Sequence, residues 1–183
     1  SMVEKVEEDL KKLTRDVEKS TEESRKTAED SARDVRRSSR EVEDVLRRLR
    51  KEVEELKDDD RAEEIVRRVV KEARDVVEEN ERSVRKVVER NRRSVEENKR
   101  VIDEVVERAK RLVERLREKL DKGKKEEVKK VEDKVKEVIE RLKKLLDESK
   151  KRHEDVIREL EKLLEESERK VRKIIRELEE TLR

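Results

Sequence analysis

The chain has 183 residues, of which 60% are charged and none is aromatic. It contains no Pro, no Cys and one Gly, and its 56 basic and 54 acidic side chains leave a formal net charge of +2. This composition is typical of long helices and coiled coils, and it excludes a strand-rich fold, a disulfide framework and a thiolate metal site. The near balance of charge provides no long-range field that would attract an anionic partner.

The first predicted element is a helix over residues 3–57. Its apolar residues recur at alternating steps of three and four, which is the spacing of a left-handed coiled coil. The helix is expected to end at Asp58-Asp59-Asp60, where Asp60 can cap the next helix and Glu63 can complete a capping box. The inward register predicted for this helix is Val3, Val6, Leu10, Leu13, Val17, Val35, Val42, Val45, Leu49, Val53 and Leu56.

The second and third predicted helices cover residues 61–121 and 125–182. The second carries apolar doublets such as Val69-Val70, which predict that it sits between the other two and faces both. It is expected to end at Asp121-Lys122-Gly123-Lys124, where Gly123 can supply a left-handed conformation. Connections this short make neighbouring helices antiparallel. The third helix returns to the coiled-coil spacing with Val128, Val131, Val135, Val138, Leu142, Leu145, Val156, Leu160, Leu163, Val171, Ile174 and Leu178.

The middle of each helix carries polar residues at the spacing of the flanking Val and Leu. Folding antiparallel helices about their loops is expected to bring Asn98, Asn91 and Asn80 each to the level of Ser, Thr or His side chains on both other helices. A buried Asn is costly unless its amide finds hydrogen-bond partners. The sequence therefore predicts three buried polar layers that specify the register, with Asn91→Leu expected to raise stability. The predicted network is Thr21, Ser24, Thr27, Ser31, Ser38, Asn80, Asn91, Asn98, Ser149, His153 and Ser167.

Several features together resemble de novo designed helical bundles with buried hydrogen-bond networks. They are the polar core layers, the surface filled with Glu, Lys and Arg, the two short connections, and Ser1-Met2, which looks like the remnant of a cleaved expression tag. That group includes designed heterodimers and caged helical switches. The resemblance covers the whole chain, and it implies a structural or interaction role without catalytic residues.

Other chemistry finds little support in the residues. His153 is the one histidine, and the Glu-x-x-His spacing of diiron bundles is missing because Lys150 lies three residues before it. Carboxylates alternate with Lys and Arg at helix-surface spacing, and none is isolated as an acid–base pair. Basic runs are interrupted by acidic residues and lack aromatics for stacking on bases. We therefore expect no enzyme activity, no metal or cofactor, and no nucleic-acid partner.

No run approaches the roughly 20 apolar residues that would span a bilayer, and the first residues lack the apolar core of a signal peptide. Localisation is thus not fixed by the sequence, and cytoplasmic recombinant expression is expected. The fold prediction is an all-α, elongated, up-down-up antiparallel three-helix bundle with coiled-coil-like packing, forming a single domain over residues 1–183. The function prediction is a monomeric designed scaffold that requires no partner. The alternative is a designed interaction module, either an oligomer component or a helical switch, whose polar layers select the partner.

Overall fold

The structure, a computed structural model, describes residues 1–56, 60–120 and 122–181. Three helices occupy nearly all of it: α1 (Met2–Glu54), α2 (Ala62–Lys119) and α3 (Lys125–Thr181), with a short 3-10 turn, η1 (Lys122–Lys124), directly before α3. No strand occurs in the described part of the chain, so the all-α prediction is confirmed. The expected helix ends at 57, 121 and 182 lie outside the described residues.

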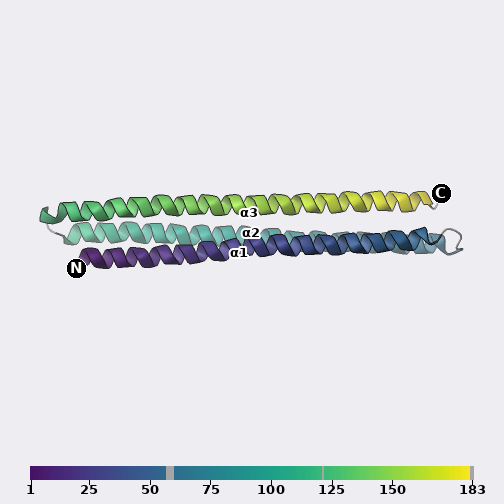
Figure 1. Ribbon diagram of the computed structural model, residues 1–183, viewed down its shortest axis with the longest axis horizontal. Helices are drawn as coiled ribbons and strands as arrows, with labels where there is room; N and C mark the ends of the chain where they lie inside the picture. The colour runs from purple at the N-terminus through teal and green to yellow at the C-terminus, as the bar shows by residue number, and fades with distance from the viewer. Residues whose placement is uncertain (57–59, 121, 182–183) are drawn as a thin grey trace. The chain divides into compact units, whose positions relative to one another are not determined.

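The chain divides into two compact units, each built from a stretch of all three helices. Unit 1 consists of Ser1–Ala28 and Asn91–Glu154, and unit 2 of Glu29–Arg90 and Asp155–Arg183. In Figure 1 the helix segments of each unit lie side by side. The pairings across helices give the directions. In both units residue numbers rise along α1 while those of the contacting α2 residues fall, and α3 runs with α1. The pairs that show this are Ser20 with Asn98, Ser24 with Ser94 and Ser149, Ser38 with Asn80, Glu52 with Arg68, Glu7 with Lys134, Arg36 with Glu159, and Glu43 with Lys170.

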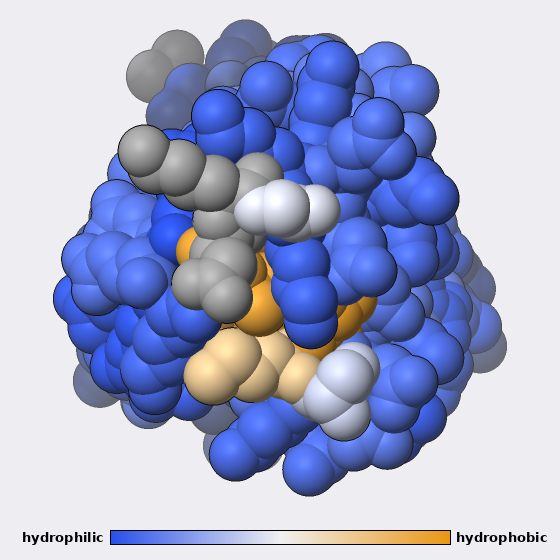
Figure 2. Space-filling view, turned by 90° about the vertical axis from the view of Figure 1, so that its left-hand side faces the viewer, coloured by the Kyte–Doolittle hydropathy of each residue, from blue (hydrophilic) through white to orange (hydrophobic). Residues whose placement is uncertain are grey.

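Each unit is therefore an up-down-up three-helix bundle with its own apolar core. In unit 1 the core is formed by Leu10, Leu13, Val17, Ile102, Val105, Ala109, Val113, Leu116, Val128, Val131, Val135, Leu142 and Leu146. In unit 2 it is formed by Val35, Val42, Leu46, Leu49, Val53, Val66, Val69, Ala73, Val77, Val84, Val87, Leu160, Val171 and Leu178. Figure 2 looks onto the end of unit 1 and shows apolar side chains at the centre, surrounded by hydrophilic ones.

Several residues of the predicted inward register are only half-buried, and at two places the next residue along the chain is buried instead. Leu46 and Leu146 are buried, whereas the predicted Val45 and Leu145 are only half-buried. The α2 doublets behave in the same way, since Val69 is buried beside a half-buried Val70. The reason is that each helix contacts two neighbours, so its apolar stripe is wider than the two positions per heptad of a single seam.

The helix ends correct two sequence expectations and add a cap at Ser1. Ser1, set aside as a tag remnant, caps α1 by accepting the backbone N–H of Glu4 at its Oγ at 3.3 Å. At the start of α2 the first carbonyl to accept is that of Arg61, from the N–H of Ile65 at 3.0 Å, so Arg61 occupies the cap position expected for Asp60. Glu63 pairs forward with Arg67 at 2.8 Å, as an i,i+4 pair, instead of completing a capping box.

Gly123 does not adopt the predicted left-handed conformation. Its φ is not positive, and it lies in the 3-10 turn that precedes α3. A 3-10 turn is right-handed and runs directly into the helix, so it requires the ordinary negative φ. No neighbouring atom lies within 4 Å of a Cβ placed there, so close packing does not require a glycine either.

Ion pairs between helices line the surface of both bundles. In unit 1, Arg117 of α2 meets Glu132 of α3 at 2.6 Å. In unit 2, Arg36 of α1 meets Glu159 of α3 at 2.9 Å. The hydrogen bond from Arg117 lowers the pKa of Glu132 below its usual value. These groups are exposed, and exposed pairs contribute little each, so the buried layers have more influence on which alignment of the helices is stable.

Candidate buried polar network

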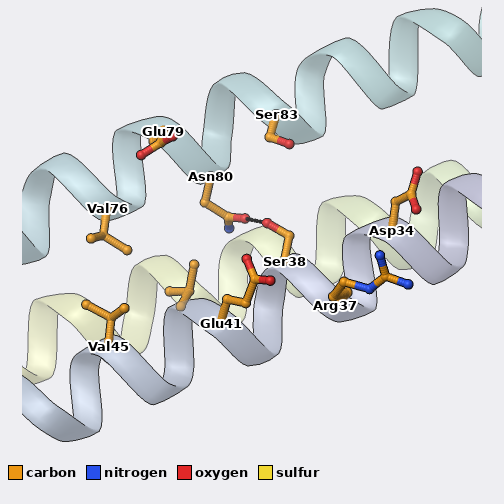
Figure 3. A pocket seen from close by; sticks show the side chains of 10 residues that line it. Asp34, Arg37, Ser38, Glu41, Val45, Val76, Glu79, Asn80 and Ser83 are labelled. Atoms are coloured by element: carbon orange, nitrogen blue, oxygen red, sulfur yellow. Dashed lines mark hydrogen bonds between the residues drawn. The ribbon is translucent and has the colours of Figure 1, made fainter.

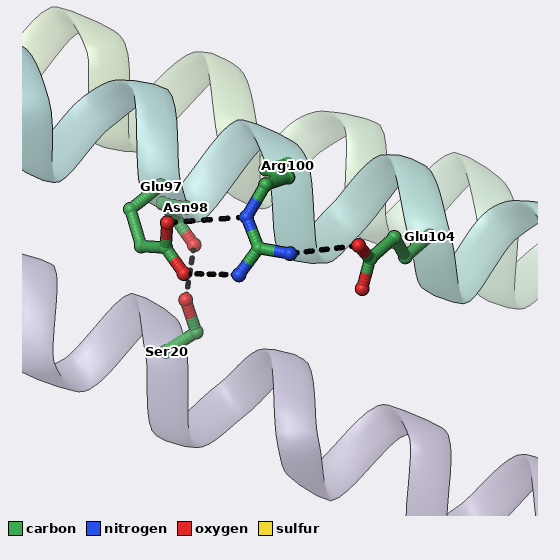
Figure 4. A network of polar contacts seen from close by, with 5 residues as sticks. All are labelled: Ser20, Glu97, Asn98, Arg100 and Glu104. Carbon is green, nitrogen blue, oxygen red and sulfur yellow. Dashed lines mark hydrogen bonds and ion pairs between the residues drawn. The ribbon is translucent and has the colours of Figure 1, made fainter.

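Asn98 joins all three helices of unit 1 on a single amide. Its Oδ1 accepts from the Ser20 hydroxyl at 3.2 Å and from the Thr21 hydroxyl at 3.3 Å, both on α1. Its Nδ2 donates to Ser149 Oγ on α3 at 3.1 Å. Figure 4 shows Ser20 reaching Asn98, while Glu97, Arg100 and Glu104 pair along the outer side of the same helix. Both ends of this buried amide are thus satisfied.

His153 is the second centre, and both of its ring nitrogens have partners. Nδ1 lies 2.8 Å from Oδ1 of Asn91 on α2, and Nε2 lies 2.7 Å from Oγ of Ser24 on α1. An amide oxygen can only accept, so Nδ1 carries the proton and Nε2 accepts from Ser24. The contacts therefore favour one neutral tautomer of the imidazole.

Ser24 connects the two centres. Its proton is directed to His153, so Ser94 donates to Ser24 Oγ at 3.1 Å and Ser149 supplies the proton of the 3.4 Å contact with Ser24. A hydroxyl offers one donor and two acceptor positions, and all three are used here. We call the connected set the unit 1 network, and its members are Ser20, Thr21, Ser24, Asn91, Ser94, Asn98, Ser149 and His153.

The polar residues of unit 2 form a smaller arrangement. The Ser38 hydroxyl donates to Oδ1 of Asn80 at 2.8 Å (Figure 3). Nδ2 of Asn80 is buried without a hydrogen-bond partner, and so is Oγ of Ser39. Ser167, predicted at the level of Asn80, is buried in unit 2, but the amide oxygen of Asn80 pairs with Ser38.

The remaining predicted members are Thr27 and Ser31. Thr27 is half-buried, and its hydroxyl donates to the backbone carbonyl of Glu23 one turn earlier at 3.1 Å. Ser31 is fully buried in unit 2. Ser94 was not predicted, although it lies three residues after Asn91 and four before Asn98 on the same helix face. That spacing was the signal by which the sequence could have identified it.

Burial sets the electrostatics of His153. The side chain is 1% exposed, and loss of water lowers the pKa of its imidazole below the ordinary value, with the nearby charge of Arg152 acting in the same direction. Ser24 on α1 and Asn91 on α2 face the ring and are both uncharged. The lowered pKa agrees with the neutral tautomer that the hydrogen bonds favour.

The order Ser24, His153, Asn91 has the atoms of a nucleophile, a base and an orienting group. Ser24 is however only 2% exposed, and none of the four surface grooves found among the described residues is lined by Ser24 or His153. Within the described residues, no group of three or more His, Asp or Glu side chains is placed to hold a metal ion. The network contacts all three helices of unit 1, and its Ser24 and His153 side chains are buried.

Fold and site together define an all-α three-helix bundle with a buried hydrogen-bond network. No protein-family model, no curated protein and no solved structure matches the chain. Among the described helices, none has an apolar stretch long enough to cross a membrane.

Proposed function

We propose that the chain is a de novo designed structural scaffold whose helix register is specified by its buried polar residues. One observation carries the proposal: in unit 1, two amides, an imidazole and five hydroxyls from three helices form one hydrogen-bond network, and five of these eight side chains are buried. The idealised surface and the short connections noted in the sequence support a designed origin.

The physical role of the network is to penalise wrong alignments. A hydrogen bond adds only about 0.5–1.5 kcal/mol to stability, whereas a buried polar group that loses its partner costs about 1–3 kcal/mol. Sliding α3 by one heptad would bring Leu146 to the level of His153 and leave Asn91 facing an apolar side chain. Apolar layers alone would tolerate such a shift, because Val and Leu recur at every heptad.

A catalytic role for Ser24 is the competing possibility that the geometry raises, and burial argues against it. We expect the protein to hydrolyse p-nitrophenyl acetate no faster than a Ser24→Ala variant does. The test is to measure the rate of p-nitrophenol release by the two proteins at equal concentration. If the hydrolysis rate depends on both Ser24 and His153, the scaffold proposal is wrong and the protein acts as an esterase.

The scaffold proposal itself is tested by removing the unit 1 network. The test variant carries Ser24→Ala, Asn91→Leu, Asn98→Leu, Ser149→Ala and His153→Leu, and the matched control carries only Asn80→Leu. We expect light scattering to give one monomer mass near 22.2 kDa for the parent and the control. The network-free variant should remain helical by circular dichroism but distribute over several masses.

Two outcomes would count against the scaffold proposal. A single monomer mass for the network-free variant would show that the apolar layers specify the assembly by themselves. A dimer or trimer mass for the parent would instead support an interaction module, in which the polar residues select a partner.

A further inference from the structure

The side-chain amide of Asn80 is half satisfied, and this is unusual for a buried group. The side chain is 3% exposed, and its Oδ1 accepts from Ser38. Nδ2 is buried and has no partner. In unit 1 the corresponding nitrogen of Asn98 donates to Ser149, so the two amides differ in this bond.

Asn80 lines a groove of about 460 Å³ between α1 and α2 of unit 2. Val42, Val45 and Val76 form the apolar part of its lining, and Asp34, Glu41 and Glu79 add three carboxylates against the single cation of Arg37. Figure 3 shows the amide of Asn80 on the groove side of α2, with the carboxylate of Glu41 close to it in the view. The groove therefore provides space and a negative rim beside the orphan donor.

The chemistry of these groups restricts what can bind. Nδ2 requires an acceptor, so a cation without a lone pair, such as ammonium or a metal ion, does not satisfy it. An anion would provide an acceptor, but the three carboxylates outnumber the guanidinium groups of Arg37 in the lining and of Arg90, which pairs with Asp34, so the net negative charge repels it. What remains is a small neutral molecule that accepts one hydrogen bond and donates others.

We propose that Asn80 is a specific water-binding site: one internal water accepts from Nδ2 and donates to the Glu41 carboxylate, entering through the groove between α1 and α2. Internal waters usually make two to four hydrogen bonds to buried polar groups that lack other partners. The nitrogen is buried, and Glu41, which lines the same groove, has an exposed side chain, so the entry of water from the groove requires a movement of the groove side chains. This inference is independent of the scaffold proposal.

The test is nuclear magnetic resonance on ¹⁵N-labelled full-length protein. Dipolar transfer from water to the Asn80 side-chain amide protons is measured in the rotating frame, where its sign distinguishes contact from proton exchange. Asn98 is the internal control, because its amide also lies beside exchangeable Ser and Thr hydroxyls but has a protein acceptor. The Asn80 signals are identified by their loss in Asn80→Leu.

We expect a water contact at Asn80 and none of comparable intensity at Asn98. Equal intensities at both amides, or no contact at Asn80, would overturn the site. A Glu41→Ala variant distinguishes water from a direct bond between Glu41 and Asn80. The contact should persist in this variant with faster solvent exchange, and Glu79→Ala, at the same rim, should leave it unchanged. A contact that appears only after Glu41 is removed would mean that Glu41 itself is the acceptor.

Discussion

In both units α2 carries Asn at positions that continue its apolar spacing, but the hydrogen bonding of these side chains differs between the units. In unit 1, hydroxyls use both ends of the Asn98 amide, and the oxygen of Asn91 pairs with the imidazole of His153. In unit 2, Asn80 has one partner, and its nitrogen remains without one. All three are Asn residues at positions that continue the apolar spacing of α2.

The difference lies in what the neighbouring helices present to each amide. Asn98 meets hydroxyls from both α1 and α3, so its acceptor and its donor are both used. Asn80 meets a hydroxyl from α1, and Val42 and Val76 lie in the same groove. A polar core residue therefore specifies register only where its partners are complete, and elsewhere it lowers stability.

The largest contrast is expected between two matched substitutions. Asn91→Leu should lower the free energy of unfolding, because it leaves Nδ1 of His153 buried without an acceptor at a cost of about 1–3 kcal/mol and places a branched side chain among polar groups. Asn80→Leu should raise it by about 1–2 kcal/mol, since it replaces an amide whose nitrogen has no protein partner by an apolar side chain beside valines. The increase in stability that the sequence predicted for Asn91→Leu is therefore expected for Asn80→Leu instead.

Urea denaturation of the two variants and the parent measures both changes. If both variants change the free energy of unfolding in the same direction, the completeness of hydrogen bonding does not explain the difference between the units.

A smaller contrast is expected from deleting single hydroxyls. Ser24→Ala removes three hydrogen bonds and leaves Nε2 of His153 without a donor, for an expected loss of about 1–3 kcal/mol. Ser38→Ala removes one bond, for a loss of about 1 kcal/mol or less. Ser20→Ala is the control, because Thr21 still donates to the same oxygen of Asn98. Thermal and urea unfolding should rank the three variants in this order, and a reversed order for Ser24 and Ser38 would contradict the comparison.

The pH dependence of unit 1 follows from His153. The pKa of His153 is lowered in the folded protein. Below pH about 6.5, the ordinary pKa of histidine, the unfolded chain therefore binds more protons than the folded protein does. Stability should therefore rise with pH through this window and fall on acidification. Denaturation at pH about 7.5 and about 5.5, in the parent and in His153→Asn, isolates the contribution. Identical losses in the two proteins would show that the imidazole does not titrate from a buried neutral state.

The smallest effect is expected at a carboxyl pair in unit 2. A hydrogen bond with Glu81 raises the pKa of Glu168 above its ordinary value. Glu168 therefore binds a proton more readily in the folded protein than in the unfolded chain. This contribution is present below the unfolded pKa and is lost as pH rises through the folded pKa. Glu168→Gln should abolish this dependence while leaving that of His153 intact. Potentiometric or denaturant titration between pH about 4 and about 6 measures the change, and an unaltered curve would exclude proton sharing at this pair.

The sequence by itself determined the three helices, their antiparallel order within each unit and the burial of the polar residues on α2. These follow from periodicity and short connections, which act locally along the chain. Ser24, Asn98, Ser149 and His153 were identified in this way, because their spacing continues that of Val and Leu.

Tertiary structure alone decided which partners each polar group meets. Whether Ser24 or Thr27 turns inward depends on a fraction of a helical turn. Whether Leu46 or Val45 is the buried residue depends on how α1 packs against two neighbouring helices at once. Hydrogen bonds require distances near 3 Å, whereas heptad spacing places a residue only to within a turn of helix. The closed network of unit 1 and the orphan amide of Asn80 therefore became visible only when three helices were packed together.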